Sequence, residues 1–446
     1  MKLNNKKWIT TISLLVVGVL AGNILMDDPG HKLGVAILIF IGGLWITEVF
    51  PLAVSGLLVP IIAVLFNVFD SEEALSHFAN PVIFVFIGGF ALAAVLNEHG
   101  IDQWLAGKLI HMAGGRKWIA VVSILGTTSF FSMWMSNTAT AAMFLPIGMS
   151  LIGRQYPRAR TYVILGIAFA ASIGGISTLI GSPPNLIAAG AIGIDFGTWF
   201  KFGFPVTLML FPLLLFVLKL VIRPERDFHL GEGESRVSEW SGKQTAAAIF
   251  FLVIVLLWIC SQPIGKLLEV DNFDAVVGIA AAAMAPVFGL TSWNKMQNSI
   301  NWGILLLFGG GLCLSAILSE TGTSAIIATS ILRNIEEGHG LMLIFMAAVF
   351  IIALTEISSN TGAAAITVPI MMEVAMQFNP EFVLPMVMVI GIGANCAFML
   401  PVSTPPNALA YATNEVTIKT MIKAGVLLDL LALPVIWFWV TKGIIF

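Results

Sequence analysis

Charged residues are scarce in this chain. Lys, Arg, Asp and Glu make up 11% of its 446 residues, whereas hydrophobic residues make up 58%, and the mean hydropathy is +0.95. A water-soluble domain would carry about a quarter charged residues. Apolar runs of roughly 20 residues, the length needed to cross a bilayer, recur along the chain. The composition therefore excludes a soluble globular protein and predicts an all-α polytopic membrane protein.

The residue groupings that enzymes and metalloproteins need are also missing. Cys260, Cys313 and Cys396 lie apart in apolar runs without a C-x-x-C spacing, so we interpret them as buried small hydrophobic residues. All six histidines lie near segment ends or in loops. The glycines of FGGGLC have no strand-and-helix context for a nucleotide loop, and we interpret them as points of close helix packing. The sequence thus predicts no enzyme, no cofactor and no nucleic-acid partner.

The apolar runs predict eleven membrane-spanning helices. The first follows a basic start without a cleavage signature, so we expect it to be retained. The expected spans lie near residues 8–26, 33–50, 52–69, 80–97, 162–190, 199–222, 244–262, 273–290, 301–319, 382–412 and 421–442.

Two further apolar stretches, 118–153 and 341–377, have polar centres. A straight helix of the first stretch would be about 54 Å long at 1.5 Å per residue. The hydrocarbon core of a bilayer is only about 30 Å thick. Each stretch is too long for one crossing and, with its polar middle, too short for two. We therefore expect two re-entrant helical hairpins.

The charges that flank the two hairpins differ in sign. Basic residues bracket the first hairpin and acidic residues bracket the second: Arg116, Lys117, Arg154, Arg158 and Arg160, against Glu336, Glu337, Glu373 and Glu381. The positive-inside rule then predicts that the first hairpin enters from the cytoplasm and the second from outside. With eleven crossings, the N-terminus lies inside and the C-terminus outside.

An internal repeat relates the two hairpins. Three pairs of segments match in the same order and at a near-constant offset: FIGGFALAAVLNEHG from Phe86 with FGGGLCLSAILSETG from Phe308, SNTATAAMFLPI from Ser136 with SNTGAAAITVPI from Ser359, and GSPPN from Gly181 with STPPN from Ser403. Each repeat would hold five crossings and one hairpin. Because five is odd, the second repeat is expected to be inverted. Inverted repeats with broken helices are typical of secondary transporters, whose site lies near the midplane.

This repeat divides the chain into four expected parts. They are an N-terminal transmembrane helix (1–30), a first repeat (31–222) with hairpin 118–153 and broken helix 162–190, a cytoplasmic linker (223–243), and a second repeat (244–446) with hairpin 341–377 and broken helix 382–412.

The paired motifs suit small ions. A Pro pair cannot continue a hydrogen-bonded helix, so GSPPN and STPPN should break their helices. The N-termini of half-helices favour carboxylates, unwound carbonyl groups favour sodium, and an Asn amide can serve both. Neither hairpin contains Lys or Arg, so dipoles, hydroxyls, amides and co-bound cations would have to neutralise an anion. Capping or kinking alone is the alternative, and repetition of the same triplet argues against it.

Glu356 lies three residues before the second S-N-T. An acid at membrane depth is costly and is by default a functional candidate. The alternative is a structural carboxylate that accepts bonds from neighbouring hydroxyl or N–H groups, and the sequence leaves both open. We interpret Glu48 and Asp429, nearer the membrane faces, as structural.

The paired S-N-T and Ser/Thr-Pro-Pro-Asn motifs and the eleven-crossing plan resemble the divalent anion:sodium symporter family, in particular bacterial INDY-type sodium-coupled dicarboxylate transporters. The resemblance covers nearly the whole chain. It implies a homodimer in the bacterial inner membrane, with a scaffold and a moving transport domain in each protomer. It also implies sodium as the coupling ion and a small dicarboxylate as substrate.

The same resemblance implies the residues of the site. The first sodium site would use Ser132, Ser136, Asn137 and Gly181, and the second Thr355, Ser358, Asn360 and Ser403. The substrate would meet Ser136, Asn137, Thr138, Ser182, Ser359, Asn360, Thr361, Thr404 and Pro405. Because Gly181 is matched by Ser403, and Met133 by Glu356, we do not expect equal sodium affinity at the two sites.

The expected function is therefore sodium-coupled uptake of a four-carbon dicarboxylate such as succinate, malate or fumarate, by an elevator-like motion. Sodium-independent exchange of dicarboxylates remains an alternative, because some members of that family work without sodium. A proton-coupled ion antiporter is a further alternative, supported only by Glu356.

Overall fold

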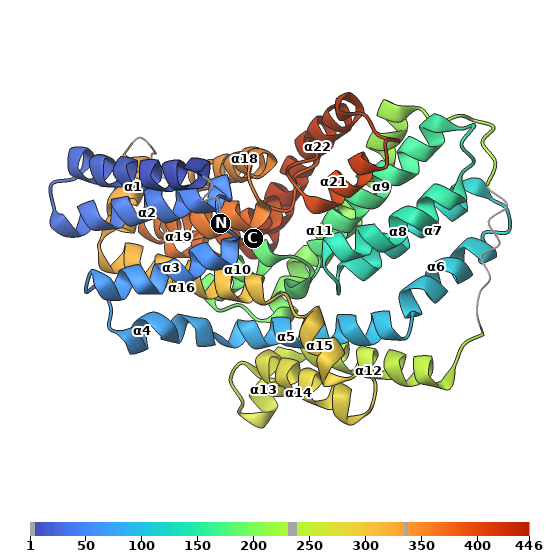
Figure 1. Ribbon diagram of the computed structural model, residues 1–446, viewed down its shortest axis with the longest axis horizontal. Coiled ribbons are helices and arrows are strands. Elements are labelled where there is room, and N and C mark those ends of the chain that lie inside the picture. Colours follow the sequence, from blue (N-terminus) through green and yellow to red (C-terminus); the bar gives the residue numbers. More distant parts are fainter. Residues whose placement is uncertain (1–4, 231–238, 334, 336–337, 446) are drawn as a thin grey trace.

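The computed structural model describes residues 5–230, 239–333, 335 and 338–445, and this part of the chain folds into α-helices with short 3₁₀ turns (Figure 1). The helices are α1 (Asn5–Leu25), α2 (Pro29–Thr47), α3 (Leu52–Leu65), α4 (Ser71–Ser76), α5 (Pro81–Glu98), α6 (Ile101–Met112), α7 (Lys117–Ser132), α8 (Asn137–Leu151), α9 (Pro157–Gly175), α10 (Pro183–Ile192), α11 (Phe196–Ile222), α12 (Gly242–Ile259), α13 (Ser261–Leu268), α14 (Phe273–Val287), α15 (Trp293–Ser299), α16 (Trp302–Glu320), α17 (Thr323–Leu332), α18 (Gly340–Ile357), α19 (Asn360–Phe378), α20 (Val383–Gly393), α21 (Pro405–Ala412) and α22 (Ile418–Ile445). The described residues contain no β-strand, so the predicted all-α class is confirmed.

The helices fall close to the predicted segments. Nine of the described helices are long and apolar enough to cross a membrane, or ten if α13 and α14, which are bent by 99° at their junction, form one span. α3 has 14 residues and is shorter than the predicted span 52–69, because the chain turns through a left-handed residue at Asn67. The charged pair Glu336 and Glu337 lies outside the described residues, as does part of the predicted linker 223–243.

Helix starts follow ordinary capping chemistry. Asp28 accepts bonds from the N–H groups of Gly30 and His31 at the start of α2. Ser241 and Gln244 form a reciprocal capping box at the start of α12. Such caps satisfy N–H groups that have no partner within the helix.

The two halves of the chain make equivalent helix contacts. α5 packs against α14, and α16 packs against α3. At an offset of 222 residues, α5 corresponds to α16 and α3 corresponds to α14, so the two contacts are equivalent. Both crossings are glycine-to-glycine: an added Cβ on Gly88 would lie 2.5 Å from Gly278 Cα, and one on Gly310 would lie 2.6 Å from Gly56 Cα. Small residues allow such close backbone approach. The interpretation of the FGGGLC glycines as packing residues is thus confirmed for Gly310.

The two stretches predicted as hairpins fold into helix–loop–helix pairs, α7–α8 and α18–α19, whose arms pack on each other. α18 and α19 are each long and apolar enough to cross a membrane, so that the pairs are re-entrant stays a prediction. The predicted broken helices are α9–α10 and α20–α21. They interlock with the hairpins across the two halves, because α10 packs on α19 while α21 packs on α8. In Figure 1 the first hairpin lies at the right end, α19 lies at the left, and α5 runs between the two ends.

The prolines do not end the first half-helices, contrary to the expectation from the sequence. α9 already ends at Gly175 and α20 at Gly393, and the Pro pairs form the first turns of α10 and α21. Proline favours this position, because its φ suits a helix and its missing N–H would have no partner there. The breaks are therefore longer than predicted, at residues 176–182 and 394–404.

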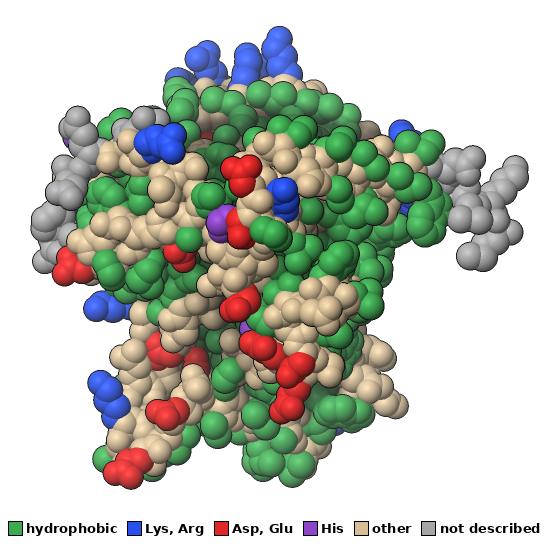
Figure 2. All heavy atoms as spheres, turned by 90° about the vertical axis from the view of Figure 1, so that its left-hand side faces the viewer, with side chains coloured by type: hydrophobic (Ala, Val, Ile, Leu, Met, Phe, Trp, Pro, Cys, Tyr) green, Lys and Arg blue, Asp and Glu red, His purple; other side chains and the backbone are tan. Residues whose placement is uncertain are grey.

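The outer surface is apolar. Ile9, Leu15, Leu20 and Ile24 of α1 are all at least half exposed. Figure 2 shows a face covered largely by hydrophobic side chains, with a row of Lys and Arg side chains at its top and most Asp and Glu side chains lower down. A soluble monomer rarely exposes apolar area on this scale, which fits contact with lipid.

Candidate functional site for an anion and cations

A cavity of about 910 Å³ lies where the two halves of the chain meet. All nine predicted substrate residues line it: Ser136, Asn137, Thr138, Ser182, Ser359, Asn360, Thr361, Thr404 and Pro405. Gly181 and Ser403 of the predicted sodium sites also line it, whereas Ser132, Thr355 and Ser358 do not. These three side chains are buried.

Four helix N-termini border this cavity. Ser136 begins α8 and accepts from Ala139 N at 3.2 Å; Ser359 begins α19 and accepts from Gly362 N at 3.4 Å. Ser182 and Thr404 hold the corresponding positions before α10 and α21. A helix N-terminus carries a partial positive charge and free N–H groups. The described lining residues include no Lys, Arg or His but do include Glu48, so the helix N-termini are the groups of the lining that can attract an anion.

A first polar cluster lies beside the tip of the α7–α8 hairpin. One terminal atom of the Asn137 amide lies 2.7 Å from Ser132 Oγ, 3.1 Å from Ala171 O and 3.2 Å from Gly181 O. The surrounding contacts favour the amide nitrogen at this position, where its two hydrogens are shared among the three oxygen acceptors. If the amide oxygen occupies it, four oxygen atoms converge, which is an environment suited to a sodium ion.

A second polar cluster lies at the tip of the α18–α19 hairpin. Thr355 Oγ1 lies 2.7 Å from Asn360 Oδ1 and 3.0 Å from Ala394 O, so a hydroxyl, an amide and a backbone carbonyl meet there as well. The hydroxyl groups of Ser358 and Ser403 bond locally, to Leu354 O and Leu400 O. Sequence reasoning missed the carbonyl groups of Ala171 and Ala394, because a backbone oxygen leaves no trace in residue type.

The Asn of each Pro-Pro-Asn motif holds the break that precedes it. Asn185 Nδ2 donates to Gly175 O and Thr178 O, both at 2.7 Å. Asn407 Nδ2 donates to the equivalent carbonyls of Ala397 and Leu400, at 3.0 and 3.1 Å. Each pair of acceptors lies ten and seven residues before the Asn. The carbonyl groups of the breaks are thereby fixed next to the two polar clusters.

Glu356 holds the second break by a further contact. Its Oε1 accepts from Phe398 N at 2.6 Å and from Met399 N at 2.8 Å. This is the structural alternative considered for Glu356, with backbone N–H groups as donors. Asp429 interacts with Glu356 and is buried.

Residues outside the motifs complete the cavity. Phe86, Phe90, Trp134 and Asn301 line it, together with Glu48, for which the sequence predicts only a structural role. Glu48 ends α2 in a left-handed conformation, with φ 46°. No motif marks these residues, because helices far apart in sequence bring them to the cavity.

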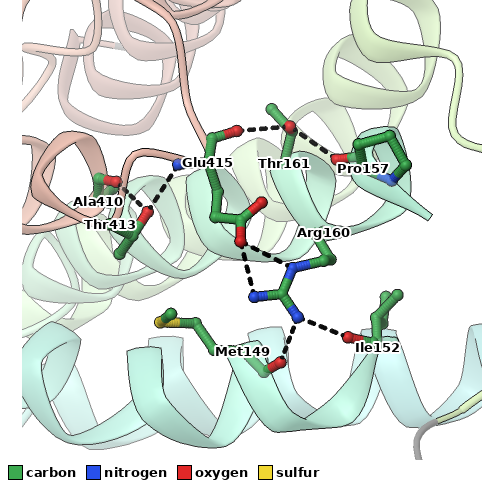
Figure 3. Close-up of polar contacts among 8 residues, drawn as sticks. All are labelled: Met149, Ile152, Pro157, Arg160, Thr161, Ala410, Thr413 and Glu415. Atoms are coloured by element: carbon green, nitrogen blue, oxygen red, sulfur yellow. Dashed lines mark hydrogen bonds and ion pairs between the residues drawn. The ribbon is translucent and has the colours of Figure 1, made fainter. Parts of the chain in front are cut away.

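A partly buried ion pair joins three elements of this region near the start of α9 (Figure 3). Arg160 of α9 donates to Glu415 Oε1 through Nε at 3.0 Å and Nη2 at 2.7 Å, and through Nη1 to Met149 O and Ile152 O. Glu415 follows α21, and Met149 belongs to α8. One guanidinium group thus joins the first hairpin, the first broken helix and the segment after the second.

Comparisons with known proteins agree with this architecture. Residues 42–383 and 275–445 match the family described as citrate transporters. An uncharacterized transporter of Haemophilus influenzae is 40% identical, over 93% of this chain and 92% of its own length. A sodium-dependent dicarboxylate transporter, SdcS of Staphylococcus saprophyticus, is 31% identical, over 90% of this chain and 84% of its own length.

The fold is similar to that of a solved membrane transporter. The YdaH transporter of Alcanivorax borkumensis superposes with a TM-score of 0.59 at 14% identity, over 85% of this chain and 89% of that one. With the family match covering most of the sequence, this chain belongs to the citrate transporter family of multi-pass membrane transporters, which is related to the divalent anion:sodium symporters.

Proposed function

We propose that this protein takes up four-carbon dicarboxylates, of the succinate, malate and fumarate type, together with sodium across the bacterial inner membrane. The observation that carries the proposal is the cavity bordered by four helix N-termini and flanked by two oxygen-rich clusters. The name of the SdcS relative supports sodium and a dicarboxylate as the pair of cargoes.

The cavity suits an anion that is neutralised without a basic side chain. Two S-N-T tips offer hydroxyl, amide and backbone N–H donors from opposite halves of the site. A dicarboxylate can place one carboxylate at each tip, where helix dipoles favour negative charge. Sodium bound in the neighbouring clusters would supply the remaining positive charge.

The arrangement also supports transport by an inverted pair of repeats. The equivalent contacts of the two halves, and the interlocking of each half-helix with the other half's hairpin, fit repeats whose interface forms the site. We infer that the hairpins and broken helices move as one unit against a frame near residues 33–97 and 244–319. A homodimer that holds the two frames together, with the N-terminus inside, completes the proposal.

Uptake into proteoliposomes tests the function. Radiolabelled succinate should accumulate when an inward sodium gradient is imposed, and should not accumulate when choline replaces sodium. Unlabelled malate and fumarate should compete, whereas citrate and sulfate should compete poorly. Equal uptake in choline, with dependence on internal dicarboxylate, would instead identify an exchanger. Uptake driven by a pH gradient alone would identify proton coupling.

Two Asn variants test the site itself. Asn137→Ala and Asn360→Ala each remove an amide placed between the cavity and a polar cluster. Hydrogen bonds to charged groups contribute about 1.5–3 kcal/mol, so each loss should weaken apparent affinity roughly 10- to 100-fold. Asn97→Ala, an exposed position of α5, is the control and should transport normally. Wild-type kinetics in both site variants would refute the assignment.

A further inference from the structure

An amide–amide hydrogen bond joins α10, directly after the first break, to the second break. Asn395 lies in the second break, and its Nδ2 donates to Oδ1 of Asn185 at 2.8 Å and to Gly391 O at 2.9 Å. Both asparagine side chains are 0% exposed. The bond therefore links α10 to the second break within the protein interior, where a hydrogen bond is electrostatically stronger than in water.

In the first half, hydrogen bonds connect Asn185 to the first polar cluster. Asn185 fixes the carbonyl groups of Gly175 and Thr178. The hydroxyl of Thr178 accepts from Gly181 N at 3.1 Å and donates to Met133 O. Gly181 supplies the carbonyl group that faces the Asn137 amide, so movement of Asn185 would move a ligand of the proposed first sodium site.

In the second half, Asn395 is adjacent in sequence to a residue of the second polar cluster. Ala394, whose carbonyl group accepts from Thr355 Oγ1, directly precedes Asn395 in the chain. Any change in Ala394 that accompanies cation binding therefore reaches Asn395 through one peptide unit. A continuous path of fixed groups then runs from one cluster to the other.

The Asn at position 395 breaks the symmetry of the repeat. At the offset of 222 residues that relates the two Pro-Pro-Asn motifs, the matching position in the first half is Ile173, which is fully buried. An apolar side chain therefore suits this place in the fold. The Oδ1 atom of Asn395 has no hydrogen-bond partner in the described part of the chain, and an unpaired buried amide oxygen lowers stability. Stability alone does not account for this residue.

We propose that the Asn185–Asn395 pair couples the two sodium sites, so that occupation of one site raises the affinity of the other. This inference rests on the sodium-coupled function proposed above. A sodium ion that orders the carbonyl groups of one break would also order the other through the amide pair. The coupling must be reciprocal, and such couplings typically change affinity by about 5- to 150-fold.

The test compares sodium dependence in wild type and in two variants. Asn395→Ala removes the bond, and Asn395→Asp replaces the donating nitrogen by an oxygen of nearly the same shape. Sodium titrations would be read both as thermal stabilisation of the purified protein and as succinate uptake, with choline keeping ionic strength constant. Wild type should give a Hill coefficient clearly above one. Both variants should give values near one, with the half-saturating sodium concentration raised at least about fivefold.

Ser177→Ala is the matched control. It removes a hydrogen bond of 2.8 Å from the Ser177 hydroxyl to Thr207, which is buried in the first break and joins residues of the first half alone. This variant should keep the wild-type Hill coefficient. Variants whose melting temperature in choline falls while the Hill coefficient stays at the wild-type value would overturn the inference. Sodium-independent stability and uptake of the wild type would refute the proposed function itself, so the two failures are distinguishable.

Discussion

At the scale of single residues, Glu356 bonds the second hairpin to its break through contacts that differ from those in the first half. The first half holds Met133 at the matching position, and there the Thr178 hydroxyl fixes the hairpin tip by bonding Met133 O. In the second half a carboxylate fixes the break by accepting two backbone N–H bonds. The buried acid thus takes the role that a hydroxyl and a carbonyl group have in the first half.

Two substitutions of Glu356 distinguish the effect of its hydrogen bonds to the backbone from the effect of its charge. Glu356→Met introduces the residue of the first half and leaves two buried N–H groups unpaired, at a cost of about 1–3 kcal/mol each. We expect lower thermal stability and uptake near background. Glu356→Gln keeps an acceptor oxygen and should fold more stably than the Met variant, with weaker sodium affinity. Identical melting temperatures for both variants and wild type would contradict the anchoring role.

At the scale of helices, the Arg160–Glu415 pair fastens three elements that surround the cavity (Figure 3). Arg160 is 4% exposed, whereas the Glu415 side chain is 25% exposed, so the loss of stability on removing one partner should be smaller than the value of about 3–5 kcal/mol for a fully buried pair. Arg160→Ala should therefore lower the melting temperature in detergent. Arg158→Ala, whose side chain is 66% exposed, is the neighbouring control and should change stability by less than about 0.5 kcal/mol. Equal changes in melting temperature for Arg160→Ala and Arg158→Ala would show that the Arg160–Glu415 ion pair does not stabilise the fold.

The start of α9 gives a pH-dependent contribution to stability. Glu225 accepts from Arg158 N at 3.1 Å and Ala159 N at 2.8 Å. Partial burial acts to raise the pKa of Glu225, but backbone hydrogen bonds and the Arg158 charge outweigh it, so its pKa lies below the usual 4.5.

Because this pKa is lower in the folded chain, the stabilisation is complete above about pH 4.5 and disappears as pH falls through the lowered value. A carboxylate at a helix N-terminus contributes about 0.3–1 kcal/mol. Melting temperatures of wild type and Glu225→Gln should differ at neutral pH and converge in acid. A difference that persists at the lowest pH would argue against a role for the charge.

The sequence predicted helices better than it predicted their contacts. The length of the apolar runs located most of the long helices to within a few residues, since this signal is local. The two S-N-T motifs pointed to the cavity because helix capping alone does not require the same polar triplet at matching places in two apolar segments. The Asn395–Asn185 bond and the exposure of Glu48 to the cavity could not be predicted, because they depend on packing between residues far apart in the chain.

At the scale of the whole molecule, the apolar surface and the polar cavity bear on how a charged substrate could cross the bilayer. A bare charge at the bilayer centre costs at least about 2.5 kcal/mol, and a dicarboxylate carries two. In the function proposed above, enclosing the dicarboxylate with sodium inside the hairpin and broken-helix unit would avoid that cost. The unit would then present its cavity first to one side of the membrane and then to the other, by moving against the frame.

Two disulfide links, introduced after replacement of Cys260, Cys313 and Cys396, distinguish this motion from a fixed site. Gly42→Cys with Ile366→Cys would join α2 of the frame to α19 of the unit, because a Cβ on Gly42 would lie 3.6 Å from Ile366 Cγ1. Gly148→Cys with Val163→Cys would join α8 to α9 within the unit, because a Cβ on Gly148 would lie 3.0 Å from Val163 Cγ1. Oxidation of the first pair should block succinate uptake while sodium-dependent substrate binding stays measurable, and reduction should restore uptake. Oxidation of the second pair should leave uptake largely intact, since both residues would move together. Full uptake with the frame-to-unit link complete would show that the cargo crosses without that motion.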